Sequence, residues 1–313
     1  MGTFFRRLSF FALVPLVVTI ITLLKADGRT DPYYLRFTTP RQSSMIIGTS
    51  RPAQGIQPHV LDSVLRTHGK EVRSFNYGFA VGYSNYGDAY LRSILRKLDT
   101  GTRDGVFILA VDPWGLSGQR SIPISDPLRD GGFIAEMDWV NMDPNIEYLL
   151  TTYKKPLLEI VLPDPRQPPS PMVLHEDGWL EIDLPMLQAD VEKRTQAKLT
   201  EYRTTRLPGA TISPQRMGYL ALTIDTLQHY GTVQLVRLPV DPRMLALEDT
   251  LAPHFSRYMQ ALADLNQVGL LDLTSNGDAW EYTDGNHLTP ESGAKVTALI
   301  ADQVAKVMDG VQK

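Results

Sequence analysis

The sequence predicts an α/β domain with about five parallel strands, preceded by an N-terminal transmembrane helix and interrupted by a mid-chain insertion. Three observations support this prediction. A long apolar run stands at the N-terminus, short apolar runs alternate with amphipathic stretches in both halves of the chain, and about a hundred residues between the halves lack that alternation. Strands that alternate with helices across short breaks are typical of a parallel sheet covered by helices.

The N-terminal apolar run is a membrane signal. Residues 8–24 carry no charge and lie between Arg7 and Lys25. At about 1.5 Å per residue they span most of a ~30 Å hydrocarbon core. The residues that follow make a poor small-x-small cleavage site, so we prefer an uncleaved anchor to a cleaved signal peptide or to a buried helix of the domain. Arg6 and Arg7 are expected to stay in the cytoplasm, which places the rest of the chain outside, in the periplasm.

The rest of the chain is expected to form one domain. We assign residues 1–26 to the anchor, 27–42 to a polar tether and 43–313 to the domain, with the insertion at about 113–212. The insertion contains a proline-rich stretch, a hairpin-like HEDGW string at 175–179 and a polar helical segment. Because loops at the carboxyl ends of parallel strands build binding sites, we expect the insertion to lie over the ligand face.

The elements of the domain follow from hydrophobic periodicity and punctuation. The GVFILAV run at 105–111 is typical of a strand buried on both faces. Thr289 and Pro290 suit the N-cap and first position of the last helix. The predicted strands are 44–47, 71–75, 105–111, 232–238 and 268–273, and the predicted helices are 59–68, 85–98, 186–202, 214–230, 247–267 and 290–308.

The composition excludes several functions. The 313 residues include no cysteine, which excludes disulfides, thiolate metal sites and a cysteine nucleophile. A net charge of −4 argues against a nucleic-acid partner, and no glycine-rich phosphate loop is present. A metal site built from Asp112, Asp284 and His287 is conceivable, but no further cluster of histidines and carboxylates supports it. We therefore expect neither a metal nor a cofactor.

Polar residues follow several of the predicted strands. Gly48-Thr49-Ser50, Asn76-Tyr77-Gly78 and Val111-Asp112-Pro113 follow strands, and Asp284-Gly285-Asn286-His287 precedes the last helix. Ligands of open α/β sheets bind at the carboxyl ends of the strands. There Ser50 would be exposed at a strand-to-helix turn, His287 could remove its proton, and Asp284 could hold the histidine in the correct tautomer. The pattern favours nucleophilic catalysis by a serine.

These motifs, in this order, resemble the SGNH (GDSL-type) hydrolases. The longer strings MIIGTSRPAQGIQP and DGNHLTPESG are similar to the membrane-anchored SGNH-like proteins encoded with membrane-bound O-acyltransferases, a group that includes the D-alanyl transfer protein of teichoic acid synthesis. The resemblance covers about 44–112 and 214–308. It implies a three-layer SGNH-like fold, with Ser50 as nucleophile, His287 as general base and Asp284 as its partner. It also implies that the backbone N–H groups of Ser50 and Gly78 stabilise an oxyanion.

The sequence departs from the family pattern at two positions. Thr49 stands where an aspartate is common, and Asp112 stands where the family has an asparagine that donates to the oxyanion. An ionised aspartate only accepts hydrogen bonds. Either Asn76 or Arg51 replaces the donor, or Asp112 is protonated, or activity is weak or absent; losing one donor lowers the rate about 10²–10³-fold. Arg51, Asp112 and Trp114 are our candidates for contact with the substrate. Arg51 has equal reason to cap the carbonyl edge of the sheet, and a loop tryptophan such as Trp114 more often covers the core.

The resemblance implies serine-dependent acyl transfer, O-acetylation or similar, on a cell-envelope or secreted polysaccharide. A membrane-bound O-acyltransferase would be the partner that delivers the acyl group from the cytoplasmic side. Two alternatives stay open. The protein could be an esterase that removes O-acyl groups from glycans, or a catalytically inactive SGNH-like scaffold of an envelope assembly complex.

Overall fold

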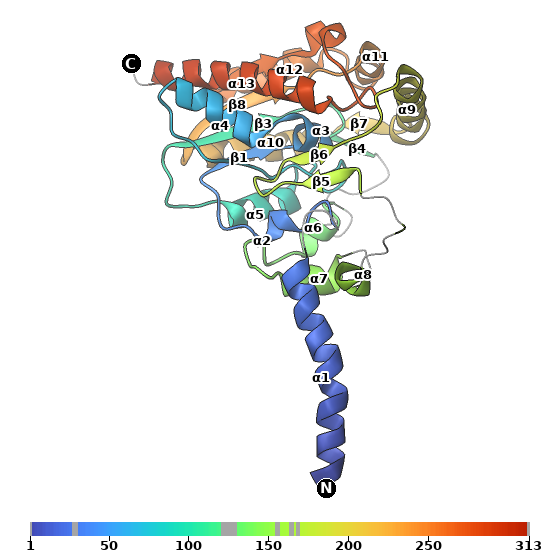
Figure 1. The fold of residues 1–313 in the computed structure, drawn as a ribbon. Coiled ribbons are helices and arrows are strands. Elements are labelled where there is room, and N and C mark those ends of the chain that lie inside the picture. Colours follow the sequence, from blue (N-terminus) through green and yellow to red (C-terminus); the bar gives the residue numbers. More distant parts are fainter. Residues whose placement is uncertain are drawn as a thin grey trace.

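The protein has a layered α/β domain from which one long helix projects (Figure 1). This computed structural model describes residues 2–26, 31–119, 130–153, 157–162, 166 and 170–311. The central sheet has five strands in the order β2-β1-β3-β8-β9, and all neighbouring strands are parallel. The predicted α/β class with five parallel strands is therefore confirmed. The strands are β1 (Ser44–Ile47), β2 (Ser74–Asn76), β3 (Gly105–Ala110), β8 (Gly231–Arg237) and β9 (Gly269–Asp272).

The sheet is buried on both faces because its central strands are apolar without interruption. All six residues of β3 are buried. Successive side chains of a strand point to opposite faces. Met45 and Ile47 accordingly join one hydrophobic cluster, and Ile46 joins another on the opposite face.

Helices cover both faces of the sheet. α4 (Pro58–Thr67) and α13 (Pro290–Val311) supply the cluster that contains Ile46. α5 (Asp88–Lys97), α10 (Pro214–Gln228) and α12 (Phe255–Asn266) supply the other cluster. The sheet therefore lies between two helical layers.

One predicted helix is two helices in the structure. The segment 247–267 was expected to be continuous, but α11 (Pro242–Leu251) ends before α12 begins. Pro253 cannot donate the hydrogen bond that a continuing helix needs. His254 then takes a left-handed conformation, with φ of +68°, which turns the chain into α12.

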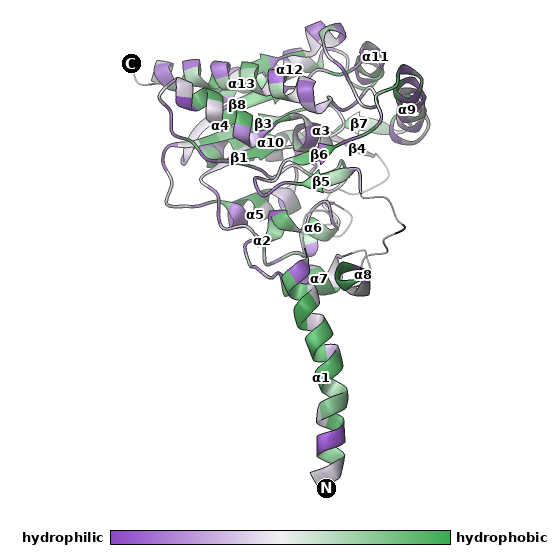
Figure 2. Cartoon of the chain, in the orientation of Figure 1, coloured by the Kyte–Doolittle hydropathy of each residue, from purple (hydrophilic) through white to green (hydrophobic). Residues whose placement is uncertain are grey.

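The projecting helix α1 (Gly2–Lys25) is apolar along most of its length (Figure 2). It is long and apolar enough to cross a membrane. A signal sequence near the N-terminus has the same length and composition, so the helix is consistent with either.

The segment predicted as a tether is packed into the domain over its described part. Residues 27–30 lie outside the described residues. Beyond them, Tyr34 and Phe37 are fully buried around the short helix α2 (Leu35–Thr38). Arg36 is buried as well and donates to the carbonyl oxygens of Asn76 and Gly178. Aromatic side chains in an otherwise polar stretch explain why this segment joins the core.

The chain between β3 and α10 adds no strand to the main sheet. Its hairpin turn at 175–179 lies against the edge strand β2, because the Asn76 N–H donates to the carbonyl of Asp177. At Gly178, where φ is +82°, a Cβ atom would lie 2.2 Å from the Asn76 carbonyl oxygen, so the close approach requires glycine. The elements of this part are β4 (Ser117–Gln119), α6 (Phe133–Glu136), α7 (Ile146–Thr151), α8 (Leu157–Val161), β5 (Met172–Leu174), β6 (Leu180–Ile182), α9 (Gln188–Glu201), the π-helix η1 (Tyr202–Arg206) and β7 (Ala210–Ile212).

Candidate active site

A sharp turn after β1 presents Ser50. Gly48 has a φ of +144°, and a Cβ atom there would lie 2.8 Å from Pro52 and 2.9 Å from the Ala110 carbonyl oxygen. The turn therefore depends on glycine. Ser50 is the first residue of the short helix α3 (Ser50–Gly55), so its backbone N–H has no acceptor within the helix.

Ser50, His287 and Asp284 form a hydrogen-bonded chain. The Ser50 Oγ lies 2.9 Å from His287 Nε2. His287 Nδ1 lies 3.0 Å from both carboxylate oxygens of Asp284. The fold thus joins residues that are 237 positions apart in the sequence. The order and distances are those of a nucleophile, a general base and the carboxylate that orients the base.

The loop before α13 fixes the two triad residues that it carries. Asp284 Oδ1 accepts the backbone N–H groups of Asn286 and His287, each at 3.0 Å. Burial alone raises the pKa of Asp284, but the His287 ring, the Lys198 ammonium and the Asn286 N–H outweigh it and hold that pKa well below its usual range. The carboxylate therefore stays ionised and accepts a hydrogen bond from the Nδ1–H of the ring.

A second contact supports the same tautomer of His287. Arg51 donates through Nε and Nη2 to Asn286 Oδ1, at 3.1 and 2.7 Å. Since a guanidinium only donates, it fixes the amide oxygen of Asn286 toward Arg51 and the amide nitrogen toward His287. The Asn286 Nδ2 lies 3.2 Å from His287 Nε2. Donors on this side leave Nε2 without a proton, as a general base requires.

Buried ion pairs hold Arg51 in place. Its Nη2 lies 2.5 Å from Glu248 Oε1, and the other Glu248 oxygen accepts from Arg237 at 2.9 Å. Burial opposes the charge of Arg51, but Glu248 and then Asp112 outweigh it and raise the pKa of the guanidinium. Arg51 is 5% exposed. It therefore lies in the interior, where it supports the loop that carries His287, rather than on an open surface as a substrate contact.

Asp112 and Trp114 are also buried, at 4% and 2% exposure. Asp112 accepts from the Thr49 hydroxyl at 2.8 Å and from the Gly115 N–H at 2.9 Å, which ties the end of β3 to the Ser50 turn. Trp114 packs edge-on against Tyr202, with ring centroids 4.8 Å apart. In this structure the expected substrate-contacting residues Arg51, Asp112 and Trp114 all have structural partners instead.

The three expected oxyanion donors differ in their availability. The Asn76 Nδ2 donates to the carbonyls of Pro52 and Ile56, at 2.7 and 2.8 Å, and so anchors α3. The Asn76 Oδ1 in turn accepts the Gly78 N–H at 3.1 Å. Within the described ranges, the Ser50 N–H is the one expected donor without such a contact.

The contacts that α9 makes with this loop have no local signal in the sequence. Arg194 Nε donates to the carbonyl of Thr283 at 2.8 Å, and the Lys198 Nζ lies 3.9 Å from Asp284. Asn286 and Glu248 were also missed. Asn286 stands next to His287 in the sequence, and that adjacency was the one available signal. Among the residues that the structure describes, no group of three or more His, Asp and Glu side chains is arranged to hold a metal ion.

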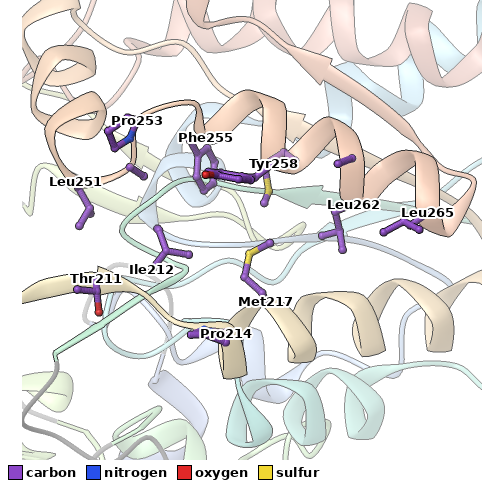
Figure 3. A pocket seen from close by; sticks show the side chains of 13 residues that line it. Thr211, Ile212, Pro214, Met217, Leu251, Pro253, Phe255, Tyr258, Leu262 and Leu265 are labelled. Carbon is purple, nitrogen blue, oxygen red and sulfur yellow. The ribbon is translucent and has the colours of Figure 1, made fainter.

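Two hollows differ in their relation to the triad. One, of about 290 Å³, includes Ser50 in its lining. The other, of about 570 Å³, lies between α10 and α12 and is lined by apolar side chains such as Met217, Phe255 and Leu262 (Figure 3). Because no residue of the Ser50–His287–Asp284 chain lines the larger hollow, the smaller one is the candidate substrate pocket.

Comparison with known proteins adds no identification. No model of a protein family matches the sequence, and a search of curated proteins gives no match. The functional argument therefore depends on the geometry around Ser50.

Proposed function

We propose that the protein is an acyl-transfer enzyme in which Ser50 is the nucleophile. The observation that carries this proposal is the continuous chain from Ser50 Oγ through His287 to the ionised Asp284. An unperturbed serine hydroxyl is a weak nucleophile, and an adjacent oriented imidazole is the usual means of activating it.

In the proposed reaction, Ser50 Oγ attacks the carbonyl carbon of an ester while His287 Nε2 takes the hydroxyl proton. Asp284 stabilises the imidazolium that forms. The Ser50 N–H donates to the oxyanion of the tetrahedral intermediate. The intermediate then breaks its bond to the leaving oxygen, which receives the proton from His287. An acceptor hydroxyl attacks the resulting acyl-Ser50 ester by the same steps in reverse.

The proposed acceptor is a sugar hydroxyl of a cell-envelope or secreted polysaccharide. The resemblance to SGNH-like proteins encoded with O-acyltransferases supports this choice, and so does α1, whose length and composition suit a membrane anchor. In that arrangement the domain works on the extracytoplasmic side, and a membrane-bound O-acyltransferase supplies the acyl group. An enzyme that receives its substrate from a membrane protein gains from being held at the membrane.

Hydrolysis of glycan O-acyl esters is the alternative that the same triad supports. The two reactions share the acyl-enzyme and differ in whether water or a sugar hydroxyl resolves it. The third possibility, an inactive scaffold, was suggested by Asp112. In the structure Asp112 accepts hydrogen bonds from Thr49 and Gly115 and lies near the positive charge of Arg51, which supports a structural role for this carboxylate at the end of β3.

The test uses the full chain in detergent with p-nitrophenyl acetate as donor and maltohexaose as acceptor. We expect p-nitrophenol release, and acetylated maltohexaose by mass spectrometry for a transferase or free acetate alone for an esterase. Both signals should disappear in Ser50→Ala and persist in Ser63→Ala, whose side chain is exposed on α4. Turnover that is equal in the wild type and Ser50→Ala refutes the proposal.

A further inference from the structure

The hollow beside Ser50 has the features of a binding site for an apolar chain. Its lining is mostly aromatic and aliphatic, with the Ser50 side chain at its boundary. Ligand pockets are typically concave and mostly apolar, with volumes of about 300–1,000 Å³, and this hollow lies near the lower end of that range. The lining residues are Asp31, Pro32, Tyr33, Ser50, Ala53, Gln54, Phe79, Ala80, Tyr83, Phe133, Tyr148, Thr152, Met172 and Leu180.

Four separate parts of the chain build this hollow. The segment that follows α1 contributes Tyr33, α3 contributes Ser50 and Ala53, and the loop after β2 contributes Ala80. The fourth part, between β3 and α10, contributes residues of α6, α7 and the β5–β6 hairpin. The part of the chain predicted as an insertion thus lies over the nucleophile, and with the segment after α1 it forms much of the hollow.

The aromatic wall is held together by contacts among its own rings. The ring of Phe133 lies 4.9 Å from Tyr83 and 5.5 Å from Tyr33, between ring centroids. Tyr33 also packs against Phe79 at 5.7 Å. Because these rings hold one another in place, fewer side chains have to become ordered when a ligand binds. The entropic cost of binding is lower as a result. This arrangement favours a preformed pocket for an apolar group.

The size of the hollow exceeds the needs of an acetyl group. A volume of about 290 Å³ equals roughly ten water molecules at ~30 Å³ each. An acetyl group has three heavy atoms and would leave most of that space unfilled. A methylene group occupies about as much volume as a water molecule, so a chain of roughly six to eight carbons fits in this hollow with its carbonyl at Ser50.

The charges around the hollow favour an uncharged chain. Asp31 is the one ionisable acid or base with a formal charge in the lining, and its Oδ1 accepts the N–H groups of Tyr33 and Tyr34 and the hydroxyl of Tyr148. These donors already compensate the carboxylate. The rings of Tyr33 and Phe79 already lie against the buried Arg36 guanidinium, 5.9 and 5.2 Å from its central carbon, so an ammonium group in the hollow would lose its hydration next to a like charge.

We propose that this hollow binds the acyl group of the substrate, and that this group is an uncharged aliphatic chain of about six to eight carbons. The inference rests on the proposed function, because it places the acyl carbonyl at Ser50 Oγ and the chain between Tyr33, Phe133 and Leu180. The group that Ser50 receives and passes on is then longer than acetyl.

The first test is a chain-length series of p-nitrophenyl esters on the full chain in detergent. We expect kcat/KM to rise up to about 200-fold from the acetate to the hexanoate, because each of the four additional buried methylenes is worth about fourfold. The 6-aminohexanoate ester, which ends in an ammonium group, should lose at least about tenfold against the hexanoate. A series in which acetate is the best substrate overturns the proposal.

Filling the hollow is the second test. Ala80→Phe should lower the hexanoate-to-acetate ratio of kcat/KM at least about tenfold, whereas Ala261→Phe, in the hollow between α10 and α12, should leave it unchanged. Comparing variants in one detergent cancels the partition of longer esters into micelles. An unchanged ratio in Ala80→Phe, with a melting temperature like the wild type, contradicts the assignment.

A binding measurement separates this proposal from the proposed function. Methyl hexanoate is titrated into Ser50→Ala, in which no turnover can occur, and heat is recorded. We expect binding that Ala80→Phe weakens at least about tenfold in the same background. If no ester is turned over but this binding is found, the proposed function fails and the pocket stands. If esters are turned over without binding or chain-length preference, the pocket assignment fails alone.

Discussion

Replacing Asn286 by aspartate tests the role assigned to the Arg51–Asn286–His287 contacts. The amide nitrogen of Asn286 lies 3.2 Å from His287 Nε2, and Arg51 fixes the amide in that orientation. Asn286→Asp puts a carboxylate oxygen at this distance. The attraction between that charge and an imidazolium is about 5 kcal/mol at an effective dielectric constant near 20, before Arg51 offsets part of it.

A carboxylate this close typically moves a titration by one to three pH units, in the direction that keeps the imidazole protonated. We therefore expect the acid limb of the kcat/KM profile to move about one to three units to higher pH in Asn286→Asp. The assay is p-nitrophenyl ester turnover in buffers from pH 5 to 9.

The matched variant is Asn286→Ala. It removes one neutral hydrogen bond to the unprotonated ring, which contributes about 0.5–1.5 kcal/mol, so the acid limb should move to higher pH by about one unit or less. Identical pH profiles for Asn286→Asp and the wild type, in folded protein, would refute the claim that Asn286 faces the basic nitrogen of His287.

Three further predictions concern the charges around the site and in the fold. Glu248→Gln should lower the free energy of unfolding by about 3–5 kcal/mol, because it leaves the buried charges of Arg51 and Arg237 without their carboxylate. Glu192→Gln, which removes the exposed ion pair with Arg243, should change that free energy by less than about 1 kcal/mol. Equal effects of the two variants in thermal melts would contradict this. Asp284→Asn should lower kcat about 10⁴-fold with little change in melting temperature at pH 7, and a loss under about tenfold would argue against its orienting role. Burial raises the pKa of Asp62 to about 6, against the opposing hydrogen bonds from Ser74. The folded state therefore binds the Asp62 proton more tightly than the unfolded chain, and this group destabilises the fold as the pH rises from about 4 to 6. Asp62→Asn should raise the melting temperature more at pH 7.5 than at pH 4.5, and equal shifts at the two values would show that this carboxyl does not titrate in the window.

The sequence predicted the candidate site best where polar residues come directly after an apolar strand. Apolar runs such as 105–111 predicted the parallel strands, and parallel strands bring their carboxyl ends to one edge. That rule alone placed Ser50 near Asp112, and the Asp-x-x-His spacing placed Asp284 within reach of His287. The local turn at Gly48 and the loop before α13 then needed little more than their own residues to form.

The remaining features depend on contacts between distant segments, which no local pattern encodes. Arg51 had equal reason to face a ligand or the interior until Glu248, about two hundred residues later, was placed beside it. Polar residues between Asp31 and Gln42 suggested a tether, but burial of Tyr34 and Phe37 depends on aromatic partners in α6 and α7. The position of the β5–β6 hairpin over the hollow likewise depends on contacts with a distant segment, such as the hydrogen bond from Asn76 to the Asp177 carbonyl.

The most direct test of the central claim is to locate the nucleophile chemically. The full chain is treated in detergent with a biotin-linked fluorophosphonate, and the modified peptide is identified by mass spectrometry. We predict a single adduct on Ser50, absent in Ser50→Ala, strongly reduced in His287→Ala and unchanged in Ser63→Ala. A folded wild-type protein that stays unmodified, or an adduct that persists in Ser50→Ala, would contradict the account.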